Sequence, residues 1–177
     1  MKILALIGSP RKGSNTDLLV DQILMGAQSK GHTITKFYLY DIEILPCIDC
    51  RKCKEDDYKC VLVDDMQELY PKLQDTDCII FGTPIYWYGP TGKMKLFLDR
   101  LRPFIANKGL RKKKGIVVIP SAEGSKACGP LLEMFRMSFA YLGIEFVKSL
   151  LVKAYERGEI SKNQEELKRA YILGEKI

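Results

Sequence analysis

Short apolar runs alternate with helical segments along the whole chain, and this alternation constrains the fold more than any other feature. Apolar or β-forming runs predict five strands, at residues 2–8, 33–40, 77–82, 115–120 and 144–152. Helical spacing predicts five helices, at residues 17–30, from 64–65 onward, and at 92–101, 129–142 and 164–174. Strands that alternate with helices form a parallel sheet covered on both faces, so we predict a doubly wound α/β fold.

The length of 177 residues suits one domain, residues 1–177, with a cysteine-rich loop at residues 46–61. Right-handed crossovers at this length favour the flavodoxin-like strand order 2-1-3-4-5. Ligands of such sheets bind where loops leave the carboxyl ends of the strands. We therefore expect the binding site at the loops that follow strands 1, 3 and 4, which are residues 8–16, 83–91 and 121–128.

Composition excludes several classes of function. The net charge is +6, and part of it comes from the basic run at residues 111–114, which no aromatic residue interrupts. Base stacking needs such aromatics, so we read this run as a solvated loop and expect no nucleic-acid partner. The single histidine, His32, precedes the second strand and so lies at the wrong edge of the sheet for catalysis. No apolar run is long enough for a membrane span or an export signal, and we expect a cytoplasmic protein without a membrane partner.

The first loop is rich in donors for an anion. It lies between a strand and a helix start, where backbone N–H groups and the helix dipole favour negative charge. The lysine of an ATP-binding Walker loop is missing, because Gly13 is followed by Ser14, and the dinucleotide fingerprint is missing too. We predict a phosphate monoester site, with a merely capped helix as the alternative. The candidate residues are Ser9, Arg11, Ser14, Asn15 and Thr16.

The other two loops have the chemistry of a site for a flat ligand. The second loop holds three consecutive aromatics, which cannot all point into a core, so it favours an aromatic ligand or a subunit contact. The third loop is small, and its glycine allows close backbone approach to a ring system. The candidates are Pro84, Ile85, Tyr86, Trp87, Tyr88 and Gly89, followed by Ser121, Ala122, Glu123 and Gly124.

Four cysteines form a compact motif, Cys47, Cys50, Cys53 and Cys60. Three thiolates spaced by three residues, with a fourth slightly further on, suit one iron–sulfur cluster. Structural zinc prefers two separated cysteine pairs, so zinc is a second interpretation and a loop without metal is a third. We expect both remaining cysteines to be inert, Cys78 as small buried apolar packing and Cys128 because no motif offers it a partner.

These motifs together resemble the NADPH-dependent FMN reductase family, and within it the iron–sulfur flavoproteins of anaerobes. The resemblance rests on the first loop, the cysteine motif, residues 64–66 and 83–87, and the pair Asp99–Arg100 that follows Lys95. It implies that the first loop holds the FMN phosphate and that residues 84–89 and 121–124 flank the isoalloxazine. It also implies a [4Fe-4S] cluster at the four cysteines, a structural role for Asp99 and Arg100, and a homodimer or homotetramer.

If FMN binds, the flavin carries the redox chemistry, and we assign no side chain as catalytic. The expected function is NAD(P)H-dependent reduction of a small electron acceptor such as a flavin or a quinone, in an oxidoreductase with or without the cluster. Two alternatives stay open. One is an electron carrier linked to ferredoxin without NAD(P)H activity, and the other is a non-catalytic nucleotide-binding domain, because a fold alone does not determine function.

Overall fold

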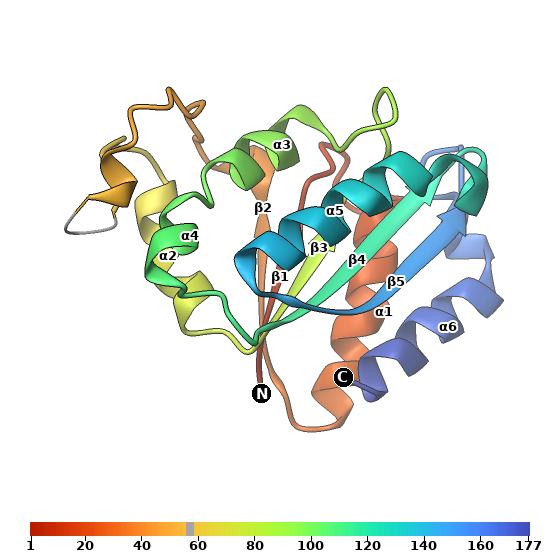
Figure 1. Ribbon diagram of the computed structural model, residues 1–177. Helices are drawn as coiled ribbons and strands as arrows, with labels where there is room; N and C mark the ends of the chain where they lie inside the picture. The colour runs from red at the N-terminus through yellow and green to blue at the C-terminus, as the bar shows by residue number, and fades with distance from the viewer. Residues whose placement is uncertain (56–58) are drawn as a thin grey trace.

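A parallel sheet forms the centre of the molecule (Figure 1). The computed structural model describes residues 1–55 and 59–177, and residues 56–58 of the predicted cysteine-rich loop lie outside this description. The described residues form five strands in the order β2-β1-β3-β4-β5, which confirms the predicted flavodoxin-like arrangement. Their bounds are β1 Lys2–Ile7, β2 Thr33–Tyr38, β3 Cys78–Gly82, β4 Lys114–Ser121 and β5 Glu145–Lys153.

Helices cover both faces of the sheet and bury an apolar core on each side (Figure 1). On one face, α1 (Asn15–Ser29) and α6 (Gln164–Glu175) pack against each other. The other face carries α2 (Met66–Gln74), α3 (Gly92–Asp99), α4 (Pro103–Asn107) and α5 (Gly129–Leu142). Because β1 and β3 lie between these two layers, their sequences are continuous apolar runs.

The sequence does not predict α4. This helix is five residues long and begins with Pro103 at its first position, so it contains too few apolar repeats to produce a helical period. None of the helices formed by residues 1–55 and 59–177 is long and apolar enough to cross a membrane.

All strands are parallel, so their carboxyl ends meet at one edge of the sheet. The segment that contains the four cysteines leaves β2 at this edge and extends away from the sheet toward α2 and α4 (Figure 1). The loops after β1, β3 and β4 leave the same edge nearer the middle of the sheet. The topology therefore separates two places where chemistry-bearing residues gather.

Candidate functional site

A cavity of about 320 Å³ opens at the carboxyl edge of the sheet. This volume lies within the range of roughly 300–1,000 Å³ that small-molecule sites occupy. Most of its wall comes from the three loops that the sequence singles out, through Ser9, Arg11, Ser14, Asn15, Thr16, Pro84, Ile85, Tyr86, Ser121, Ala122 and Glu123. The structure therefore brings eleven of the fifteen predicted cofactor-binding residues to one cavity.

The first loop presents donors at one end of this cavity. In α1, the N–H of Leu18 bonds back to the Ser14 carbonyl at 2.9 Å, and the preceding amide N–H groups have no helical acceptor. The Ser14 hydroxyl accepts one bond, from the Gly158 N–H at 3.2 Å, and its own proton is free to donate. Thr16 lines the cavity beside it, and Arg11 adds an exposed positive charge. Such a donor set suits a phosphate.

Two of the predicted phosphate ligands have structural partners. The side-chain amide of Asn15 donates to the Glu156 carbonyl at 2.8 Å, and its oxygen accepts from the Ile160 N–H at 3.2 Å. Ser9 Oγ accepts from the Arg11 N–H at 3.2 Å. Asn15 thus holds the segment after β5 against α1, and Ser9 shapes the loop while keeping a hydroxyl proton to donate.

Thr91 joins the first loop to the second. Its hydroxyl donates to the Gly8 carbonyl at 2.5 Å, and its N–H donates to Thr83 Oγ1 at 3.2 Å. A Cβ atom at Gly8 would lie 2.8 Å from Cβ of Met94 in α3, so this close approach requires glycine. Backbone contacts therefore set the distance between these two walls of the cavity.

The second loop is a tight hairpin. Tyr86 and Gly89 exchange backbone hydrogen bonds of 2.9 and 3.0 Å, and the two residues between them, Trp87 and Tyr88, have φ of +50° and +61°. Positive φ at both central residues is the mark of a type I′ turn. Tyr86 lines the cavity, whereas Trp87 is 98% exposed and, like Tyr88 and Gly89, is not part of the described wall. Figure 1 shows this loop standing clear of the sheet edge, between β3 and α3.

The third loop is held in shape by the buried thiol of Cys128, so the expectation that this cysteine has no partner in a motif is wrong. The Ser121 hydroxyl and the Cys128 Sγ both donate to the Gly124 carbonyl, at 2.8 and 3.2 Å. Burial raises the pKa of the Cys128 thiol, which favours the protonated, donating form. Gly124, at φ +59°, shapes this turn without joining the described cavity wall.

Sequence reasoning misses four residues of the wall, Pro120, Ala127, Ala154 and Tyr155. Ala154 and Tyr155 follow β5, and the Glu159 carboxylate accepts from the Tyr155 N–H at 2.7 Å. The rule that ligands bind at the carboxyl ends of strands applies to β5 as well. Applying the rule to the loop after the fifth strand would have predicted Ala154 and Tyr155.

The four cysteines line one small hollow, together with Arg102. Asp49 and Arg51, on either side of Cys50, have φ of +49° and +64°, and this left-handed backbone reverses the chain there. Burial raises the pKa of Cys53, the other three thiols raise it further, and Arg102 opposes them. Among the described residues, however, no three His, Cys, Asp or Glu side chains are arranged to hold a metal ion.

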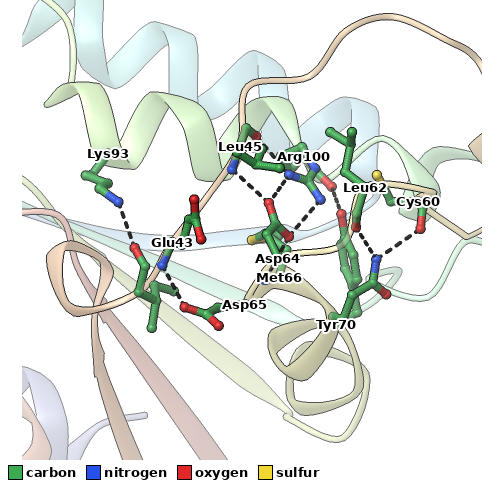
Figure 2. Close-up of polar contacts among 12 residues, drawn as sticks. Glu43, Leu45, Cys60, Leu62, Asp64, Asp65, Met66, Tyr70, Lys93 and Arg100 are labelled. Carbon is green, nitrogen blue, oxygen red and sulfur yellow. Dashed lines mark hydrogen bonds and ion pairs between the residues drawn. The ribbon is translucent and has the colours of Figure 1, made fainter.

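A buried ion pair anchors the cysteine segment to the end of α3 (Figure 2). Asp64 and Arg100 have side chains only 0% and 1% exposed, and the guanidinium contacts both carboxylate oxygens. The backbone N–H groups of Leu45 and Met66 also donate to Asp64, at 2.8 and 3.1 Å. Burial alone would raise the pKa of Asp64, but the bonds from Arg100 and from the two N–H groups lower it below its ordinary value.

Asp99 and Arg100, which the sequence treats as a helix-end pair, have different partners. Asp99 bonds Lys95 at 2.7 Å on the surface, while Arg100 turns inward to Asp64. Both residues make ion pairs within the fold, and the partner of Arg100 is distant in sequence. Arg100 also lines the cysteine hollow, and its Nε is a buried atom without a hydrogen-bond partner among the described residues.

A parallel sheet in this order, with a donor-rich loop at the start of α1, defines the class of flavodoxin-like proteins. The model of the NADPH-dependent FMN reductase family matches residues 1–155, a stretch that ends at the last residue of the cavity wall. The chain belongs to this family.

Relatives of two kinds resemble the chain. An iron–sulfur flavoprotein of Methanocaldococcus jannaschii is 38% identical over 122 residues, which cover 69% of this chain and 63% of that relative. The chain thus matches less than two thirds of that relative's length. A Bacillus subtilis protein named as an NAD(P)H-dependent FMN-containing oxidoreductase is 28% identical over 181 residues, which cover 98% of this chain and 96% of that protein.

A solved structure extends the likeness in fold. The NAD(P)H:quinone oxidoreductase from Methanothermobacter marburgensis superposes with a TM-score of 0.76 at 18% identity, covering 98% of this chain and 93% of that one. At this identity the likeness concerns the fold alone.

Proposed function

We propose that this protein is an FMN-dependent oxidoreductase that takes electrons from NAD(P)H and passes them to a small acceptor such as a flavin or a quinone. The cavity carries this proposal, because the donor-rich first loop and the second and third loops line it together. Membership of the FMN reductase family supports the cofactor. The names of the Bacillus relative and of the quinone oxidoreductase support the donor and the class of acceptor.

The described residues fit FMN. Ser14, Thr16, Arg11 and the amide N–H groups at the start of α1 would hold the phosphate, with Ser9 beside them. Residues 84–86 and 121–123 would flank the ring system, with Trp87, Tyr88, Gly89 and Gly124 at the outer ends of the two loops. When bound, FMN supplies hydride and electron transfer, while the chain binds and orients it.

A hydrolytic site built from a serine and a histidine is disfavoured by the placement of the single histidine. His32 lies beside the amino end of β1, where its Nδ1 is 3.3 Å from the N-terminal amine. The cavity lies at the opposite edge of the sheet, so no histidine can activate a serine of the described wall.

The test is a flavin titration followed by turnover. Apoprotein should bind FMN stoichiometrically, and the loaded protein should oxidise NADPH or NADH faster with a quinone than an equal concentration of free FMN does. Protein that fails to bind FMN contradicts the proposed cofactor. FMN-loaded protein that oxidises neither nucleotide contradicts the reductase and leaves the electron carrier as the function to test.

A second candidate is an electron carrier that receives electrons from ferredoxin through a [4Fe-4S] cluster. The hollow shared by the four cysteines favours it, and so does the name of the Methanocaldococcus relative. Cys47, Cys50, Cys53 and Cys60 would be the ligands, since four thiolates hold such a cluster. The unpartnered Arg100 Nε in the same hollow would suit a nearby sulfur. The described sulfurs do not fit a single ion.

Iron and acid-labile sulfide, measured on protein made without oxygen, test this candidate. Cys50→Ala should lower both, whereas Cys78→Ala, which removes a cysteine buried in β3, should lower neither. Equal iron contents in the wild type and Cys50→Ala would mean that the four cysteines are not ligands.

A further inference from the structure

A buried carboxylate lies directly behind the first loop. Asp17 is on the first turn of α1, its side chain is 3% exposed, and Oδ2 accepts from the Gly13 N–H at 2.6 Å. Gly13 has a φ of +67°, so this bond secures the loop where its backbone is left-handed. The helix dipole favours an acidic residue in the first turn, but here its charge lies close to the site proposed for the phosphate of FMN.

The start of α1 has only one of the two hydrogen bonds of a capping box, and Asp17 accepts it. In a capping box, the serine or threonine before the helix bonds an amide of the first turn, while an acidic residue three positions later reaches back to that residue's own N–H. Here the Ser14 hydroxyl makes no such bond, and Asp17 reaches one residue further back, to Gly13. Asp17 therefore ties the loop at Gly13, and the amide N–H groups at the start of α1 that a capping serine would have bonded stay available to a ligand.

Two residues of β2 neutralise and orient this carboxylate. Lys36 forms an ion pair with Asp17 and a second one, at 2.5 Å, with Asp21. The Tyr38 hydroxyl donates to Asp17 at 2.9 Å. Burial alone would raise the pKa of Asp17, but the bonds from Lys36, Gly13 and Tyr38 lower it, so the carboxylate stays ionised.

The ammonium of Lys36 thus offsets the charge that Asp17 places near the cavity. Without this lysine, a poorly solvated carboxylate would repel an incoming phosphate. Lys12, from the same loop, adds a second connection to the end of β2, because its ammonium pairs with Asp41 at 2.5 Å and lies 4.7 Å from the centre of the Tyr38 ring. Strand β2 therefore secures the loop at two points.

We propose that Asp17, held by Lys36 and Tyr38, is a positioning residue that fixes the first loop for a phosphate ester and so makes the site select FMN over riboflavin. This inference rests on the proposed FMN site. Asp17 itself is not in the cavity wall, and it acts through Gly13 and the loop that carries Ser14. An Asp17 that only stabilised the fold would affect both flavins alike, because the two ligands differ in the phosphate alone.

The experiment compares dissociation constants for FMN and riboflavin, measured by quenching of flavin fluorescence. Asp17→Ala should weaken FMN binding by about tenfold or more, and riboflavin binding by less than about twofold. Asp17→Asn keeps an oxygen for the Gly13 N–H and should stay within about threefold of the wild type for FMN. Asp21→Asn is the matched control, since Asp21 also pairs with Lys36 but does not touch the loop, and both affinities should be unchanged.

Each result has a distinct meaning. If Asp17→Ala weakens the binding of FMN and of riboflavin by the same factor, the ratio of their dissociation constants is unchanged. This result overturns the inference while leaving the FMN site in place. Wild-type protein that binds riboflavin as tightly as FMN contradicts the proposed phosphate site itself. Should Asp17→Ala not fold, Lys36→Met leaves Asp17 uncompensated and should lower FMN affinity selectively, and equal loss for both flavins in that variant overturns the inference.

Discussion

Single residues of the first loop divide into those that shape it and those left free to bind. Three side-chain oxygens accept hydrogen bonds from the backbone: those of Ser9, Asn15 and Asp17 accept from the N–H groups of Arg11, Ile160 and Gly13, respectively. Ser14 and Thr16 border the cavity as Ser9 and Asn15 do. The Ser14 oxygen accepts only from the Gly158 N–H, and the hydroxyl protons of both residues can donate to a ligand. The second group should therefore determine phosphate affinity.

Replacing Ser14 and Thr16 together by alanine should weaken FMN binding by at least about a hundredfold. Each hydrogen bond to a charged group contributes about 1.5–3 kcal/mol, and both donors are lost. Titration of apoprotein with FMN measures the effect, and Thr33→Ala, at the exposed start of β2, is the control. Unchanged affinity in the double variant would remove the phosphate from this loop.

The buried ion pair between Asp64 and Arg100 should contribute strongly to the stability of the fold. Arg100→Met should lower the free energy of unfolding by about 3–5 kcal/mol, because it leaves the Asp64 carboxylate buried without its charged partner. Urea unfolding at neutral pH measures the change. Lys95→Met breaks the exposed pair with Asp99 and should cost about 1 kcal/mol or less. Similar losses in the free energy of unfolding in the two variants would contradict the conclusion that burial makes the Asp64–Arg100 pair more important than the exposed one.

Local spacing predicts the site residues that lie within loops, and it misses those whose partners are distant in sequence. The loop rule brings Ser14, Pro84 and Ser121 to one cavity because parallel strands end at a common edge. The contacts of Asp17 with Lys36 and of Arg100 with Asp64 depend on how α1 packs beside β2 and how α3 meets the cysteine segment. Neither packing detail is visible in a local pattern.

Among the elements, the strands and their order follow from the sequence, while the shortest helices do not. Continuous apolar runs identify β1 and β3, because both faces of each are buried. The five residues of α4 carry no periodic signal. The hairpin after β3 also escapes prediction, since type I′ turns usually contain asparagine or glycine and this one has Trp87 and Tyr88.

That hairpin should be more stable with residues suited to its turn. Trp87→Asn combined with Tyr88→Gly should raise the free energy of unfolding by about 1–2 kcal/mol, because left-handed backbone disfavours bulky residues. Thermal unfolding tests this stability. If the aromatics contact the flavin or a second subunit, the same variant should lose FMN affinity or self-association, measured by titration and by sedimentation. A variant that is less stable and otherwise unchanged would contradict both statements.

At the scale of the whole molecule, buried carboxylates connect the binding edge to the core. Asp17 joins α1 to β2 beside the cavity, and Asp64 joins the cysteine segment to α3 (Figure 2). Each is paired with a cation, and each has its pKa lowered in the folded protein. Each ion pair therefore holds two separate elements together beside one of the two candidate sites.

Acid should consequently destabilise the protein. A carboxyl group whose pKa is lower in the folded than in the unfolded chain stabilises the fold fully above its unfolded value of about 3.9, and this contribution disappears as pH falls through the folded value. The free energy of unfolding should thus decline from about pH 5 downward, as Asp17 and Asp64 take up protons on unfolding.

Urea titrations from neutral pH to pH 3 measure this decline in the free energy of unfolding. Asp64→Asn should be less stable at neutral pH and show a shallower decline, whereas Asp99→Asn, in an exposed pair with Lys95, should keep nearly the wild-type slope. An Asp64→Asn variant with the full wild-type slope would mean that this ion pair does not govern the response to acid.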